Sequence, residues 1–363
     1  MKKNLLTRIC SAMLLFTGVS AALAADTADL TATQTSPDKG LTLLFAGDIV
    51  PDGIPGNMMK KGRDPLRGVS NILTSTDIRI GNLESVVSLR GERGHKIFTF
   101  RAHPVTLKLL KPYFDVLSVA NNHSGDFGKT AFMDTLQHTR QAGLMTVGGG
   151  KNLREAHQAV IIEKRGLRIA ILAYNEFMPR SFEAGSATPG VAWSEDEQVL
   201  ADIRAAIEQQ KADIVIPFMH WGWENEQIAS KRQRELAYKM IDAGATAVIG
   251  GHPHVTQETE IYRGKPIIYS LGNFLIDSLD NEPQTRGWIA RLEIDRQGVI
   301  AFDTKPVRLN TRGIPAFSAD QSSPCWYRGL TTPTACKSGS PAWIRPGSSA
   351  LPAVSVTPGR TQP

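Results

Sequence analysis

Short apolar runs alternate along this chain with segments of helical spacing, and each run ends in a small polar cluster. Runs of this kind, bounded by Gly or Pro, are typical of buried strands, and they lie at 41–46, 78–80, 116–120, 214–218, 245–249 and 266–270. Apolar positions with helical spacing lie at 104–113, 129–142, 195–211 and 230–243. The alternation predicts an α/β fold, with the carboxyl ends of the strands converging on one edge where ligands gather.

Three further pairs of alternating runs are joined by short turns, which predicts β-hairpins. The turns lie at 165–166, 263–265 and 295–298. Hairpins added to alternating strands and helices predict a mixed two-sheet sandwich. Past Thr311 the composition changes to Pro, Ser, Thr and Gly. We therefore expect one domain at 41–310, a flexible lead-in at 25–40 and a partly disordered extension at 311–363.

The polar clusters contain the side-chain types that bind divalent metals. Carboxylates, an amide and imidazoles follow different runs as Asp48, Glu84, Asn122, His123, His220, His252 and His254. Alternate residues of extended backbone point the same way, so we expect His252 and His254 to address one point, stiffened by Pro253. Asp and Asn are also common turn residues, and that interpretation explains any single cluster. It does not explain all of them together, so the pattern favours a site.

Weaker candidates lie close to these clusters. Glu224 is either a partner that orients the ring of His220 or a surface carboxylate. Asn273 either hydrogen-bonds a ligand or shapes its turn. A basic stretch follows Glu84 and comprises Arg90, Arg93, His95, Lys96 and Arg101. Within it Arg101 is the best candidate for holding the carboxylates of a polyanion, and a solvated loop is the alternative.

Six ordered motifs between residues 41 and 309 resemble those of the CapA family of capsule and poly-γ-glutamate biosynthesis proteins. The motifs are Ala46-Gly47-Asp48, Gly81-Asn82-Leu83-Glu84, Ala120-Asn121-Asn122-His123, His220-Trp221-Gly222, Gly251-His252-Pro253-His254-Val255 and Tyr269-Ser270-Leu271-Gly272-Asn273-Phe274. The resemblance implies the four-layer α-β-β-α sandwich of calcineurin-like metallophosphoesterases. It also implies a role in making or exporting an anionic polymer such as poly-γ-glutamate, beside membrane-bound polymer synthase subunits.

The resemblance further implies a site for two divalent ions such as Mn, Zn, Fe or Mg. Residue by residue, it makes Asp48 and His254 ligands of the first metal, makes Glu84 the bridging carboxylate, and makes Asn122, His220 and His252 ligands of the second. His123 then falls where a metallophosphoesterase keeps the histidine that protonates a leaving group. A typical phosphoesterase begins with Asp-x-His, whereas Ile49 and Val50 follow Asp48 here. The first metal is therefore expected to have three protein ligands unless Asp52 reaches it.

Three functions are compatible with these features. The leading one is a CapA-like protein whose metal-dependent, hydrolase-type site acts on, or holds, the polymer. The second is a metallophosphoesterase or amide hydrolase with phosphorylated or glutamyl substrates. The third is a scaffold without turnover that couples a membrane synthase to export. The sequence contains no P-loop, dinucleotide-binding fingerprint or nucleic-acid-binding motif.

The amino terminus and the cysteines indicate export. A basic head, an apolar stretch at 9–23 and the ending Ala22-Leu23-Ala24 predict a secretory signal cleaved after Ala24, with an uncleaved membrane anchor as the alternative. Because residues 1–24 carry three basic and no acidic residues, cleavage lowers the net charge from +6 to +3. Cys325 and Cys336 then remain as an isolated pair, which predicts a disulfide in the periplasm or outside the cell.

Overall fold

The computed structural model describes residues 40–318 and 323–336. The expected signal peptide, nearly all of the expected lead-in and the last 27 residues of the expected extension, 337–363, lie outside the described residues. None of the described helices reaches the length and hydropathy needed to cross a membrane.

A ten-stranded mixed sheet is built around β1 (Leu41–Ile49). On one side β2 (Ile78–Leu83) and β5 (Val116–Ser118) continue it in parallel, and on the other β16 (Arg286–Asp295) is antiparallel. The other strands of this sheet are β6 (Met145–Val147), β15 (Asn273–Leu275), β17 (Gly298–Leu309), β18 (Pro315–Phe317), β19 (Pro324–Tyr327) and β20 (Thr334–Ala335).

A six-stranded sheet supplies the second β layer. Its strands are β8 (Val160–Lys164), β9 (Leu167–Asn175), β11 (Ile214–His220), β12 (Val248–Gly251), β13 (Thr259–Tyr262) and β14 (Lys265–Ile268). The antiparallel pairs β8–β9, β13–β14 and β16–β17 confirm the three expected hairpins. Two small pairs complete the strands: β3 (Val86–Val87) with β4 (Arg101–Ala102), and β7 (Gly149–Gly150) with β10 (Gly190–Val191).

Helices cover the outer face of each sheet. The longer ones are α1 (Gly53–Lys60), α4 (Gly128–Gln141), α6 (Asp196–Glu208) and α7 (Lys231–Asp242). The shorter ones are α2 (Ser70–Leu73), α3 (Thr106–Leu110), α5 (Leu153–Ala156) and the 3₁₀ turns η1 (Arg67–Val69), η2 (Arg180–Phe182) and η3 (Pro283–Thr285). The four segments of helical spacing correspond to α3, α4, α6 and α7, whereas α1, α2 and α5 were not expected.

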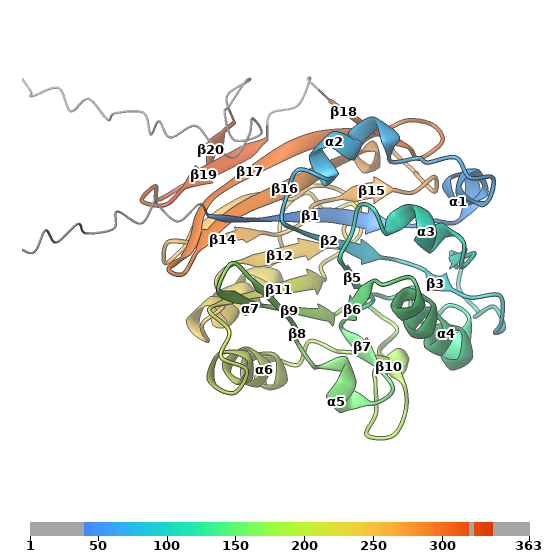
Figure 1. The fold of residues 1–363 in the computed structure, drawn as a ribbon, viewed down its shortest axis with the longest axis horizontal. Helices are drawn as coiled ribbons and strands as arrows, with labels where there is room; N and C mark the ends of the chain where they lie inside the picture. The colour runs from blue at the N-terminus through green and yellow to red at the C-terminus, as the bar shows by residue number, and fades with distance from the viewer. Residues whose placement is uncertain (1–39, 319–322, 337–363) are drawn as a thin grey trace, which may run out of the picture. The chain divides into compact units, whose positions relative to one another are not determined.

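The burial of β1 shows why the sheets form two inner layers. Leu43 and Phe45 face the second sheet, where Phe45 meets Phe218 edge to face at 5.6 Å between ring centroids. Leu44 and Ala46 point the other way and pack in one apolar cluster with Phe132 of α4. A third cluster lies between the second sheet and α6 and α7. The layers therefore run helices, sheet, sheet, helices, which confirms the expected four-layer sandwich (Figure 1).

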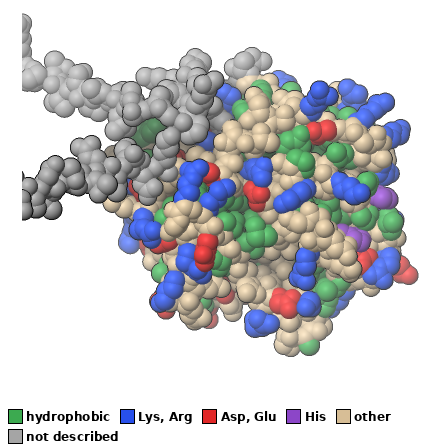
Figure 2. Space-filling view, viewed as in Figure 1, with side chains coloured by type: hydrophobic (Ala, Val, Ile, Leu, Met, Phe, Trp, Pro, Cys, Tyr) green, Lys and Arg blue, Asp and Glu red, His purple; other side chains and the backbone are tan. Residues whose placement is uncertain are grey.

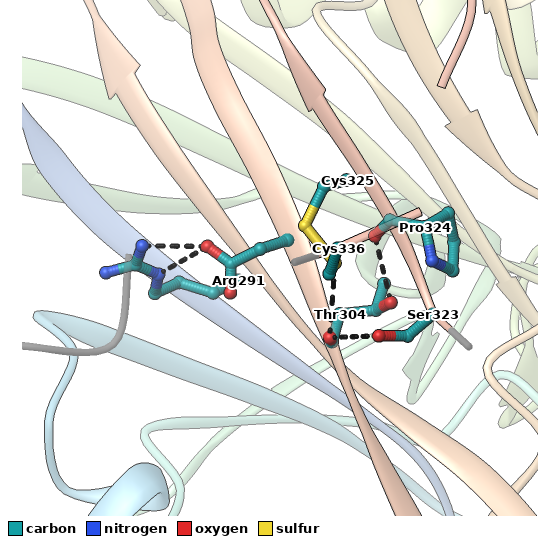
Figure 3. Close-up of a disulfide and its surroundings, with 7 residues drawn as sticks. Arg291, Thr304, Ser323, Pro324, Cys325 and Cys336 are labelled. Carbon is teal, nitrogen blue, oxygen red and sulfur yellow. Dashed lines mark hydrogen bonds and ion pairs between the residues drawn. A yellow bond between two sulfur atoms is a disulfide. The ribbon is translucent and has the colours of Figure 1, made fainter. Parts of the chain in front are cut away.

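Part of the segment expected as an extension pairs with the first sheet. Strand β18 and strand β19 both run antiparallel to β17. Cys325 and Cys336 form the expected disulfide, and the hydroxyl of Ser323 donates a hydrogen bond to the carbonyl of Thr304 beside it (Figure 3). The disulfide thus fastens the described end of the chain along the edge of β17.

Candidate metal centre

The polar residues that follow the strands of both sheets meet at one edge of the sandwich. Figure 1 shows β1 and β2 ending toward the same side. From the first sheet, Asn82 donates a hydrogen bond to Asp48 Oδ1 at 2.8 Å. Between the sheets, Asn122 Oδ1 lies 2.8 Å from His220 Nε2 at the end of β11. The expected convergence is therefore present, with the six strand ends divided between two sheets.

The loop after β12 has a different backbone from the one expected. His252 and His254 have φ of 94° and 59°, in the left-handed region, so the expected extended conformation is wrong. Such a conformation costs a residue other than glycine about 1–3 kcal/mol and is found where the surrounding structure enforces it. Here the carbonyls on either side of His252 are engaged, with Gly251 accepting from Trp221 and Pro253 from Asn225. Both rings still reach the same edge, with centroids 5.9 Å apart.

Candidate ligand atoms gather in three overlapping groups, each with its atoms within 4.8 Å of one another. The groups are Glu84 with His220 and His252, Asp48 with Glu84 and His254, and Glu224 with His252 and His254. Glu84 belongs to the first two groups. A shared carboxylate is the position that the family resemblance assigned to the bridging ligand.

Glu84 is a fully buried carboxylate without a hydrogen-bond donor. Neither of its oxygens has a hydrogen-bond partner among the described residues. The closest imidazole nitrogens to Oε1 are Nε2 of His220 at 3.4 Å and Nε2 of His254 at 3.9 Å. Burial by itself would raise the pKa of Glu84, but the charges of His254 and His220 outweigh it and lower the pKa to about 2. A buried charge without donors is costly, and a cation beside it removes that cost.

The Nε2 atom of His220 has more polar neighbours than it can hydrogen-bond. This atom lies 2.8 Å from Asn122 Oδ1, 3.1 Å from His252 Nδ1 and 3.4 Å from Glu84 Oε1. One ring nitrogen carries at most one hydrogen and cannot form a hydrogen bond with all three of these neighbours. Two nitrogens and two oxygens around one point form a donor set that zinc, manganese and iron accept.

The two histidines after β12 differ in their protonation. Burial, reinforced by the charges of His220 and His254, holds the pKa of His252 well below its usual range, so the ring is neutral, as metal ligation requires. Burial would also lower the pKa of His254, but the carboxylates of Glu84 and Asp48 raise it to about 10. A metal ion at the Asp48 group would therefore have to displace a proton from His254.

Asp48 and His254 are each held by an asparagine. Asn82 bonds Asp48 Oδ1, and the other oxygen of Asp48 lies 3.3 Å from His254 Nδ1. Asn273, a candidate ligand-binding residue, is buried, and its Oδ1 lies 2.9 Å from the same Nδ1. It therefore orients the His254 ring. Asp52 does not reach this group, because its Oδ2 accepts the backbone N–H of Arg101 at 2.7 Å.

His123 lies beside the cluster and faces it with one nitrogen. Its Nδ1 is 2.7 Å from Asp126 Oδ2, and its Nε2 is 4.0 Å from Glu84 Oε1. The ring packs on Phe100 at 4.5 Å between centroids. Lys96 binds the other oxygen of Asp126 at 2.7 Å and the carbonyl of Asn122 at 2.8 Å. Hydrogen bonding by Asp126 thus keeps Nε2 directed toward the cluster.

The sequence interpretation missed some neighbours of the cluster. In the sequence Lys96 is one of several cations in a basic stretch, and nothing in the local pattern distinguishes it from Arg93 as a partner of the cluster. The ring centroids of Phe177 and His252 lie 3.9 Å apart. Trp223, with an exposed fraction of 66%, meets Phe177 edge to face. Phe177 carried no signal because an aromatic residue in a loop is uninformative without its neighbours.

The remaining candidates lie at the periphery. Glu224 is exposed and shares its group with His252 and His254, and no hydrogen bond joins it to His220 in the described part of the chain. Arg101 is exposed, and its guanidinium carbon lies 4.1 Å from the centroid of the Phe127 ring.

Proteins of similar sequence are named for capsule biosynthesis. Residues 42–278 match the family described as bacterial capsule synthesis protein PGA_cap. The chain is 32% identical over 290 residues to the PGA biosynthesis protein CapA of Bacillus subtilis (strain 168), and the alignment covers 76% of this chain and 74% of that relative. It is 30% identical over 310 residues to the capsule biosynthesis protein CapA of Bacillus anthracis, which covers 81% and 74%. Among solved structures, the 5′-nucleotidase precursor of Thermus thermophilus has a TM-score of 0.48 at 11% identity, covering 76% of this chain and 56% of that one.

Proposed function

The chain belongs to the PGA_cap family of bacterial capsule synthesis proteins, and we propose that it uses the cluster around Glu84 as a two-metal, hydrolase-type site on an anionic capsule polymer. The polymer class, a poly-γ-glutamate-like chain, follows from what its curated relatives are named for. We propose further that the protein works after export, beside the membrane-bound subunits that make the polymer.

The observation that carries the metal proposal is the environment of Glu84. Its two oxygens are buried and have no hydrogen-bond donor among the described residues, and it belongs to both the His220 group and the Asp48 group. A buried carboxylate without donors depends on nearby positive charge; His254 and His220 supply part of it, and two divalent cations would supply more. The residues present therefore fit two ions. Asp48, Glu84 and His254 would hold the first, and Glu84, Asn122, His220 and His252 the second.

The protein's own residues supply positioning and proton transfer. Divalent cations, when bound, polarise a carbonyl or phosphoryl oxygen and lower the pKa of a water molecule. His123 is placed to give a proton from Nε2 to the departing group, because Asp126 holds its Nδ1. Phe100 and Phe177 pack on the rings of His123 and His252, which limits the access of water to both imidazoles.

The test compares metal content and turnover in purified proteins. Elemental analysis after incubation with manganese, zinc or iron should find metal in the wild type and less in His252→Ala. His95→Ala is the matched control, since His95 is an exposed imidazole outside the three groups. The Asp48 group has three ligand-type residues, whereas Glu84, Asn122, His220 and His252 make four. We therefore expect the ion held with His252 to be retained better than the ion held with Asp48. Wild-type protein that stays metal-free would contradict the proposal.

A second experiment measures turnover. It detects the new amino groups released when γ-linked glutamate oligomers are cleaved and, in parallel, the hydrolysis of a general phosphoester. Cleavage of the oligomer supports the polymer as substrate. Hydrolysis of the phosphoester alone would instead favour a phosphoesterase, and metal binding without either activity would favour a scaffold.

A further inference from the structure

A separate pocket of about 190 Å³ lies beside the metal centre, between α1 and the β3–β4 pair. Its lining includes three basic side chains, Lys60, Arg101 and His103, and one carboxylate, Asp52. Figure 2 shows Lys and Arg side chains distributed over this whole face of the molecule, including the right-hand side where α1 lies in Figure 1. The pocket is thus a concavity with an excess of positive charge.

The two permanent cations of this pocket lack an acceptor. The guanidinium of Arg101 lies over the Phe127 ring, which restrains it, and no side chain or carbonyl among the described residues accepts from its N–H groups. The ammonium of Lys60 likewise has no acceptor within the described ranges. Arginines elsewhere in the fold, such as Arg79, are engaged by carboxylates. A restrained guanidinium with free donors suits a planar oxyanion.

The one carboxylate of the pocket offsets only part of this charge. Asp52 Oδ2 already accepts the backbone N–H of Arg101 at 2.7 Å. His103 accepts a hydrogen bond from the backbone N–H of Val105 at Nδ1, which leaves Nε2 as its second polar atom. Lys60, Arg101 and Asp52 together leave one net positive charge in the lining. The chemistry of the lining therefore selects an anion.

The pocket is close enough to the metal centre for one ligand to reach both. Asp52 follows Asp48 by four residues, and Ser88 in the pocket wall follows Glu84 by four. Four residues of chain span at most about 14 Å. Phe100, which packs on His123, is directly followed by Arg101. A γ-linked glutamate chain repeats about every 6 Å, so roughly two of its residues would bridge this distance.

We propose that this pocket is an anion subsite, formed by Arg101 and Lys60, for a carboxylate or phosphate group of the same substrate whose reacting bond lies at the Glu84 cluster. The inference rests on the proposed function for the location of that bond. It assigns the pocket to substrate selection: a chain long enough to reach it gains an ionic contact that a short fragment cannot make.

The test measures binding by calorimetry at fixed ionic strength, in a His123→Ala background so that the ligand is not consumed. The probes are a γ-linked glutamate decamer, free glutamate and inorganic tripolyphosphate. Arg101→Gln and Lys60→Gln should each weaken decamer binding roughly three- to tenfold, as expected for a charged hydrogen bond at a partly exposed site. Lys61→Gln removes the same charge one residue outside the pocket and should change binding less than about twofold. Free glutamate, which is too short to span the two sites, should not distinguish these variants.

The outcomes separate this inference from the proposed function. Decamer binding that is equal in Arg101→Gln and Lys61→Gln would overturn the subsite and leave the metal site standing. Tripolyphosphate binding that depends on Arg101, without decamer binding, would support the subsite, identify phosphate as its ligand and overturn the polymer as substrate. Binding of none of the probes would overturn the subsite and the polymer substrate together, while metal content would still report on the cluster. Arg101→Lys should retain part of the affinity, because it keeps the charge and loses only the planar fork.

Discussion

Substitution of Glu84 by Gln should remove the response of the protein to metal. The change keeps the size of the side chain and removes the charge shared by the Asp48 and His220 groups. A metal that binds only the folded state at a hundred times its dissociation constant adds about 2.7 kcal/mol to the free energy of unfolding. We expect manganese to produce a gain of this order in the wild type and little or none in Glu84→Gln, because both groups lose the negative charge that they share.

In the metal-free protein, the lowered pKa of Glu84 gives a second, independent value for what this side chain contributes to the free energy of unfolding. The fall in the pKa of Glu84 from 4.5 to about 2 corresponds to roughly 3 kcal/mol of preference for the ionised form in the folded state. Since a lowered carboxylate pKa stabilises the fold above the unfolded-state value, this contribution should be present above pH 4.5. It should be lost as the pH falls from 4.5 toward 2. Without metal, Glu84→Gln should therefore be less stable than the wild type at neutral pH, and the difference should shrink in acid.

The assay is denaturant unfolding followed by tryptophan fluorescence, with manganese or with a chelator. Glu92→Gln is the matched control, because it makes the same change at an exposed carboxylate. The reasoning is refuted if Glu84→Gln gains as much stability from manganese as the wild type does. A variant that is more stable than the wild type without metal would show that burial of the charge outweighs its interactions with His254 and His220.

The remaining predictions concern proton transfer and export. His123→Ala should keep its metal by elemental analysis but lower any turnover by about 10²–10⁴-fold, since the role proposed for its side chain is to donate a proton and not to bind metal; loss of metal in this variant would make His123 a ligand instead. Mass spectrometry of the mature protein should find Ala25 as the first residue and Cys325 joined to Cys336, whereas an intact amino terminus with free thiols would argue against export. Cys325→Ser should lower the free energy of unfolding by about 3 kcal/mol in denaturant titrations, through loss of the constraint on the unfolded chain.

Most elements of the fold could be predicted because their signals are local. Alternation and apolar runs are properties of neighbouring residues, so β1, β11 and the three hairpins were identified without knowledge of the packing. The short helices α2 and α5 could not be predicted in this way. Each has four residues, which is too short to show helical spacing, and a helix of this length is not stable without contacts to the rest of the fold.

The candidate ligands were predictable for a different reason. Asp48, Glu84 and His220 each stand at the end of an apolar run, and an α/β fold brings such ends together whatever the details of packing. The backbone of His252 was predicted wrongly, because a left-handed conformation at a residue other than glycine has no local signal. It is imposed by contacts with loops that are distant in the sequence.

The sequence by itself therefore determined the order of the main strands and helices along the chain, the set of ligand-type side chains and the cysteine pair, because each depends on residue type and spacing. Only the tertiary structure decided which atoms share a centre. That Glu84 serves two groups, that Lys96 and Asp126 hold His123, and that Arg101 and Lys60 line one pocket depends on distances between residues far apart in the chain. Such distances follow from how two sheets pack against each other, and a one-dimensional pattern does not contain that packing.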